Sequence, residues 1–203
     1  MTQRAGANVD VTDSQTLGQT EPLVYSAPAR TFHWLTAAIV IVMIPLGFLI
    51  AYEGPMFKLP EALGNGLASA HKLIGFLLLW LVIARLIYRL RNGAPPDEPT
   101  LDPLQKGVAH ATHWLLYLLL IAVPLSGWIG ISLYGARELF ELFSLPPLTG
   151  VDQKASDGVF AWHLRGAVLI LFLASAHVAA ALYHYFIRKD GVLRRMLPNL
   201  DRS

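Results

Sequence analysis

Four long apolar runs are the feature that most limits how this chain can fold. Residues 34–52, 73–84, 114–133 and 168–187 contain no Asp, Glu, Lys or Arg. A bilayer core about 30 Å thick is crossed by roughly 20 helical residues, and each run reaches that length with its flanks. The sequence therefore predicts four membrane-spanning helices. Their expected bounds are 31–52, 68–91, 106–133 and 159–188.

The composition supports a membrane protein. Hydrophobic residues make up 54% and charged residues 15% of the 203 residues, and the mean hydropathy is +0.47. Soluble proteins carry about 25% charged residues. We therefore expect an all-α integral membrane protein, a bundle of four transmembrane helices. Residues 28–198 are expected to form this domain, between a disordered cytoplasmic tail at 1–27 and a C-terminal tail at 199–203.

The segments between the predicted spans differ in character. Residues 92–99 carry three prolines and form a linker, because proline inside a helix removes a backbone hydrogen bond. In the longer loop at 134–158, the apolar residues of 136–143 recur at helical spacing. This recurrence predicts a short helix lying in the membrane interface.

The basic residues indicate how the chain is oriented. Placing both chain ends and the 91–105 linker on one side gives that side 11 of the 16 Lys and Arg residues. Loops rich in Lys and Arg stay in the cytoplasm. We therefore expect both termini to be cytoplasmic.

The chain contains no cysteine, which narrows the chemistry open to it. Disulfides, thiolate zinc sites, iron–sulfur clusters and thioether-attached haem are excluded. The net charge of +2 and the scattered basic residues argue against nucleic acid as a partner. Any metal or cofactor must be held by oxygen ligands or by the seven histidines.

Four histidines fall into two depth layers. His71 and His163 each lie in the first turns of a span that enters from the periplasmic side, whereas His33 lies in the first turns of span one on the cytoplasmic side. His177 follows His163 by 14 residues, about 21 Å and nearly four whole turns, so one helix face presents a histidine at each depth.

This arrangement suits stacked haems, since a haem iron takes an axial imidazole on each side of its ring. His71 can complete a periplasmic pair with His163, and His33 a cytoplasmic pair with His177. Small residues leave room for a macrocycle or for close helix approach. Gly47, Gly75 and Gly166 are the candidates.

Alternatives remain open at this point. His113 or His110 lies on the same side as His33 and can replace it as the ligand. Interfacial histidines, His184 included, also occur without any ligand role. A zinc site would need three or four clustered ligands rather than two layers.

Two further features stand out within the spans. The His-Trp-Leu triplet at 33–35, followed by Pro45 and Gly47, is repeated at 113–115 with Pro124 and Gly127, which indicates two similar hairpins. Arg85 lies 14 residues after His71, at the depth of His177. It either snorkels to the cytoplasmic surface or acts as a counter-charge to a haem propionate or a contact to a bound quinone.

Several segments together resemble the bacterial cytochrome b561 family, over residues 32–198. They are 33–35, 71–75, 109–113 continuing to 123–125, 162–163, 177–186 with 189–190, and 194–198. The resemblance implies a multi-pass protein of the bacterial inner membrane that holds two haem b groups. It implies His33 and His177 as ligands of the cytoplasmic haem, and His71 and His163 as ligands of the periplasmic haem.

Within that family, the resemblance points to an enzyme that oxidises periplasmic superoxide and passes the electrons through both haems to ubiquinone. Lys72 and Arg165 adjoin the two periplasmic ligands and are candidates for attracting the superoxide anion. Arg85 and His110 are candidates for acting on the quinone, with His113 and His184 as further proton carriers on the same side.

Two other functions stay open. One is a cytochrome b electron-transfer subunit, which takes electrons from a different periplasmic donor protein docked on the loop at 134–158. The other is a haem-free membrane anchor.

Overall fold

The structure, a computed structural model, describes residues 24–53, 56 and 58–197. Residues 1–23 of the predicted N-terminal tail and the predicted tail at 199–203 lie outside the described residues. The four predicted spans are confirmed as four helices long and apolar enough to cross a membrane. They are α1 (Ala27–Tyr52), α2 (Glu61–Asn92), α3 (Pro103–Tyr134) and α4 (Gln153–Tyr183), and α4 continues as one π-helical turn, η2 (His184–Arg188).

Helices α3 and α4 begin before their apolar runs, at polar capping residues that lie outside those runs. The Asp102 side chain accepts a hydrogen bond from the backbone N–H of Gln105 at 2.8 Å and so starts α3. Asp152 caps α4 through the N–H of Ala155 at 3.0 Å. At its other end α3 stops at Gly135, whose φ of 91° is left-handed.

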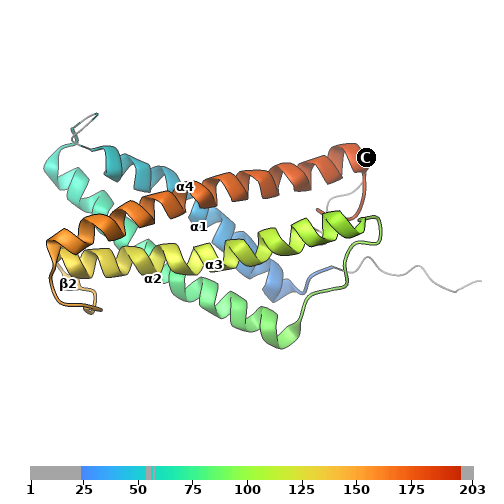
Figure 1. The fold of residues 1–203 in the computed structure, drawn as a ribbon, viewed down its shortest axis with the longest axis horizontal. Helices are drawn as coiled ribbons and strands as arrows, with labels where there is room; N and C mark the ends of the chain where they lie inside the picture. Colours follow the sequence, from blue (N-terminus) through green and yellow to red (C-terminus); the bar gives the residue numbers. More distant parts are fainter. Residues whose placement is uncertain (1–23, 54–55, 57, 198–203) are drawn as a thin grey trace, which may run out of the picture.

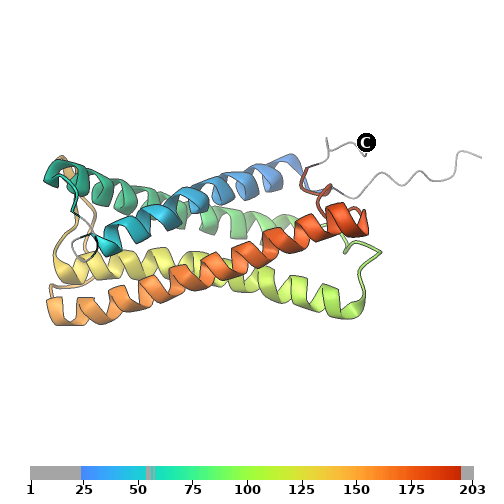
Figure 2. The same ribbon diagram turned by 90° about the horizontal axis from the view of Figure 1, so that it is seen from above.

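The helices form an elongated bundle, with α3 and α4 side by side along its length (Figure 1). Seen from above, α1 and α2 make one layer and α3 and α4 the other (Figure 2). The closely packed pairs are α1 with α2, α2 with α3 and α3 with α4. Among the described helices, α1 with α4 is not one of these pairs.

The buried core lies in the middle of the bundle. It consists of side chains from α2, α3 and α4: Leu78, Val82, Tyr117, Leu120, Val123 and Ile170. Ile170 is seven residues from both His163 and His177, so the core occupies the depth between the two histidine layers.

The prediction of a helix at 136–143 is wrong. This segment is a β-hairpin of β1 (Glu138–Leu139) and β2 (Phe143–Ser144). Phe140 and Glu141 have positive φ values of 53° and 59°, which close a tight turn and cannot continue a helix. The side chain of Leu139 is fully buried. We call this end of the bundle the hairpin end, and the opposite end, with residues 24–26 and 189–197, the terminal end.

Candidate haem-binding site

The hairpin end brings two of the predicted ligands face to face. His71 of α2 and His163 of α4 have ring centroids 6.1 Å apart, with their planes at 78°. The Nδ1–H of His163 donates to the backbone carbonyl of Val123 at 2.9 Å. His71 Nδ1 is buried and has no hydrogen-bond partner among the described residues.

Glycines on the neighbouring helices make room for these rings. A Cβ atom added at Gly47 of α1 would lie 3.0 Å from His71 Cε1, and one at Gly127 of α3 would lie 2.9 Å from His163 Cε1. The repeated glycines therefore have equivalent positions, each against the histidine of the following helix. Gly166 has a different role, because α3 approaches it closely through the side chain of Val123.

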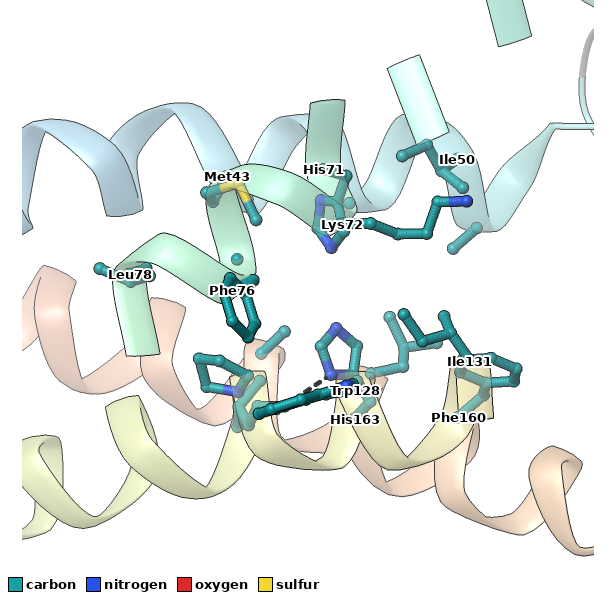
Figure 3. Close-up of a pocket in the computed structure, with 18 of the residues that line it drawn as sticks. Met43, Ile50, His71, Lys72, Phe76, Leu78, Trp128, Ile131, Phe160 and His163 are labelled. Atoms are coloured by element: carbon teal, nitrogen blue, oxygen red, sulfur yellow. Dashed lines mark hydrogen bonds between the residues drawn. The ribbon is translucent and has the colours of Figure 1, made fainter. Parts of the chain in front are cut away.

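Between the two rings lies a cavity of about 620 Å³. Figure 3 shows His71 and His163 on opposite sides of this cavity, with Lys72, Phe76 and Trp128 around it. The volume falls in the range of cofactor sites, and the walls are mostly aliphatic and aromatic side chains.

These residues fit a haem. His71 and His163 face each other across the cavity (Figure 3) with ring centroids 6.1 Å apart, so the two imidazoles could hold one haem iron between them. The Val123 carbonyl holds the proton of His163 on Nδ1 and leaves the Nε2 lone pair for a metal. The apolar cavity suits a macrocycle. Within the described residues, no three His, Asp or Glu side chains are grouped for a metal ion, as a zinc site would require.

The terminal end repeats this spacing with a second pair. The ring centroids of His33 on α1 and His177 on α4 are 6.2 Å apart, with their planes at 72°. The ring of His113 on α3 lies closer to His177, at 5.3 Å. The hollow found at this end, beside Arg85 and Tyr117, measures only about 30 Å³. A macrocycle here therefore requires the side chains to separate.

Arg85 of α2 contacts the terminal-end histidine pair through His33. Its guanidinium nitrogen lies 3.0 Å from His33 Nδ1, and its Cζ atom lies 5.1 Å from the centroid of the Tyr117 ring. All four helices thus contribute a side chain to this layer. The position of Arg85 was predicted from its spacing to His71, but its contacts with His33 and Tyr117 were not, since linear spacing does not show which helices adjoin.

The two residues predicted to attract superoxide contact different parts of the protein. Lys72 lines the cavity, and its ammonium donates to the backbone carbonyls of Ala136 and Glu138 in the hairpin. Arg165 is exposed on α4, where its guanidinium lies over the Trp162 ring at 5.2 Å. Arg165 is not among the described residues that line the cavity.

Two other histidines form hydrogen bonds with carboxylates at the terminal end. His110 is half exposed and lies 3.0 Å from the Asp97 carboxylate in the linker. His184 Nδ1 lies 2.6 Å from Asp190, and both side chains are largely buried. Thr100 also donates to Asp190 at 3.3 Å, which joins the linker to the C-terminal segment.

The fold and the site define a class: a membrane-spanning four-helix bundle with histidine pairs suited to haem. The sequence model of prokaryotic cytochrome b561 matches residues 24–199. The chain belongs to this family. It is accordingly a multi-pass electron-transfer protein of the bacterial inner membrane and binds b-type haem.

Individual relatives carry different names. The chain is 34% identical over 181 residues to cytochrome b561 homolog 2 of Escherichia coli, covering 87% of this chain and 92% of the relative. It is 31% identical over 174 residues to the probable superoxide oxidase CybB of Yersinia pestis, covering 86% and 96%. It is 30% identical over 177 residues to a probable Ni/Fe-hydrogenase B-type cytochrome subunit of Azotobacter chroococcum, covering 79% and 72%.

Proposed function

We propose that this protein is a dihaem superoxide:ubiquinone oxidoreductase. The observation that carries the proposal is the pair of matched spacings, 6.1 Å between His71 and His163 and 6.2 Å between His33 and His177, at two depths of one bundle. The relative named probable superoxide oxidase supports the choice of electron donor. When bound, a b-type haem supplies a one-electron carrier.

In this proposal the hairpin end faces the periplasm, and His71 and His163 hold one haem there. The Val123 carbonyl fixes the His163 ring. The positive charge of Lys72 lies beside the cavity and, together with Arg165, attracts superoxide. Glycines at 47 and 127 keep the two histidine rings in place.

At the cytoplasmic side, His33 and His177 would hold the second haem once the side chains of the terminal end separate, and ubiquinone is reduced nearby. The balanced reaction consumes two superoxide anions, one ubiquinone and two protons and gives two O₂ and one ubiquinol. His110, His113 and His184 lie on this side, and a neutral imidazole carries both a proton donor and a proton acceptor nitrogen. His184 and Asp190 form a largely buried pair, whereas His110 and Asp97 are half exposed.

A reconstitution with purified protein tests the proposal. Superoxide and a soluble ubiquinone analogue are added, and quinol formation is followed in the absence of any second polypeptide. We expect quinol in proportion to the superoxide consumed, two anions per quinol. His71→Ala and His163→Ala should abolish it through loss of a haem, whereas His110→Ala should retain both haems and only slow quinol formation. Absence of quinol from protein with a full haem content would refute superoxide as the donor.

A second candidate is an electron-transfer subunit that receives electrons from a docked partner protein. The relative named as a hydrogenase cytochrome subunit favours it. The hairpin also presents exposed apolar side chains, with Leu142 at 82% exposure and Phe143 at 52%. This function predicts haem reduction by the partner and none by superoxide.

A further inference from the structure

Lys72 is the one Lys, Arg, Asp or Glu side chain among the described residues that line the hairpin-end cavity. The other ionisable side chains in these walls are His71 and His163, which face each other, and Tyr134. The remaining side chains are apolar or aromatic. A buried anion is costly unless a cation and hydrogen-bond donors compensate it, so an anionic group in this cavity finds its counter-charge at Lys72.

The ammonium group of Lys72 lies at the end of the cavity nearest the hairpin. Figure 3 shows the side chain extending along the cavity toward Ile50. There the ammonium donates to the backbone carbonyl of Ala136 at 3.2 Å and to that of Glu138. An ammonium group has three N–H donors, so these two contacts leave one N–H for a further acceptor.

The charge of Lys72 is not balanced by a carboxylate of the protein. Within residues 24–53, 56 and 58–197, the carboxylates in contact with a charged or titratable partner are Asp97 and Asp190, each beside a histidine of the terminal end. Glu138 accepts from Lys72 through its backbone carbonyl, and its side chain forms no ion pair with the ammonium. The cavity therefore offers a fixed positive charge to a ligand.

The b-type haem of this family has the matching chemistry. It is a flat, largely apolar macrocycle that carries propionate carboxylates at one edge. The apolar walls and the facing histidines fit the macrocycle, and Gly47 and Gly127 leave space for the histidine rings. A carboxylate that enters the cavity with the ring needs a donor there, and a charge-assisted hydrogen bond from an ammonium is among the strongest.

We propose that Lys72 binds a propionate carboxylate of the haem held by His71 and His163, while the same ammonium keeps its bonds to the hairpin. The proposal rests on the hairpin-end haem of the function proposed above and is independent of the second haem. The pairing offsets the negative charge that this carboxylate would otherwise present to an approaching superoxide anion. It also connects the hairpin to the cofactor through one side chain.

Infrared spectroscopy of isotope-labelled haem tests the contact directly. Cells are fed aminolaevulinate with carbon-13 at its carboxyl carbon, which labels the propionates, and the spectrum of unlabelled protein is subtracted. Lys72→Met and Lys72→Gln should both shift labelled carboxylate bands, because the C–O stretching frequencies depend on the donor that the carboxylate accepts from. Lys72→Arg keeps a charged donor and should stay closer to the wild-type spectrum than either neutral variant.

Arg137→Met is the matched control. Arg137 is another cation of the hairpin segment, and its guanidinium donates to the Leu145 carbonyl at 2.7 Å. It is not among the described residues that line the cavity. This variant removes a charged anchor of the hairpin without removing a donor from the cavity, so the labelled bands should remain as in wild-type protein.

Haem transfer to an excess of apomyoglobin gives a second measurement that does not depend on turnover. Lys72→Met should release one haem about tenfold faster than wild-type protein, because a hydrogen bond to a charged group is lost. Arg137→Met should release haem at the wild-type rate. Loss of this haem during purification from the neutral variants, with retention in Lys72→Arg, would support the proposal more strongly.

Three results would overturn the proposal. They are labelled bands that do not move in either neutral variant, an equal shift in Arg137→Met, and loss of the haem from Lys72→Arg as well as from the neutral variants. The last would mean that Lys72 acts through packing. Failure of the hairpin-end site itself looks different, because His163→Ala would then retain all of its haem.

Discussion

At the scale of single residues, the choice between His33 and His113 decides how the proposed terminal-end haem would be held. His113 lies closer to His177, yet the separation of 6.2 Å between His33 and His177 matches the pair at the other end. We predict that His33→Ala lowers the haem content from about two per chain to about one, and that His113→Ala does not. Pyridine haemochrome assays against protein mass measure this. The reverse result would make His113 the ligand.

A glycine beside the proposed ligand His163 gives a second residue-scale prediction. Gly127→Val should displace the His163 ring, because even a Cβ atom there would lie 2.9 Å from His163 Cε1. We expect loss of the hairpin-end haem, measured by haem content and the α-band spectrum. Gly107→Val on the same helix is the control, since nothing lies within 4 Å of a Cβ at that position. Retention of both haems in Gly127→Val would show that the cavity adapts.

The sequence predicted which histidines share a depth but not what surrounds them. A spacing of 14 residues on one helix is fixed by helical geometry, so the alignment of His163 with His177 follows from the sequence alone. The Val123 carbonyl has no sequence signal, because every residue has such a group. The contact of Arg85 with His33 depends on which helices adjoin.

At the scale of elements, the segment at 136–143 shows tertiary contacts overriding a local pattern. Leu139, Leu142 and Phe143 have helical spacing, but α2 binds the backbone of this segment instead. The Lys72 ammonium holds the carbonyls of Ala136 and Glu138, and the Ser69 hydroxyl accepts from the N–H of Phe140 at 3.1 Å. These donors and acceptors favour a hairpin, and hydropathy does not reveal them.

This anchoring gives a testable prediction for the hairpin. Lys72→Met removes the charged donor and should destabilise the closed hairpin by about 1.5 kcal/mol, roughly a tenfold increase in local opening. Hydrogen exchange at the backbone amides of Leu142 and Leu145, both hydrogen-bonded within the loop, measures it. Lys154→Met, at an exposed position on α4, is the control. Unchanged exchange would show that the other contacts of the hairpin, such as Leu139 burial and the Ser69–Phe140 hydrogen bond, hold it without Lys72.

At the scale of the whole molecule, hydropathy is sufficient to predict the four helices but does not predict the cavity. Apolar runs of the right length leave few alternatives in a bilayer, because the backbone must form its hydrogen bonds internally. The cavity of about 620 Å³ depends on side chains from all four helices, which linear sequence does not align.

The last prediction concerns the whole molecule, because the electron donor and the protons are proposed to come from opposite ends of the bundle. If superoxide is oxidised at the hairpin end and protons for quinol are taken at the terminal end, each turnover moves charge across the bilayer. In proteoliposomes with the terminal end inside and superoxide added outside, the lumen should become negative and alkaline, followed with a potential-sensitive dye and a trapped pH indicator. A protonophore should abolish both signals without stopping quinol formation. Quinol formation with no potential, or with alkalinisation outside, would place quinone reduction at the hairpin end.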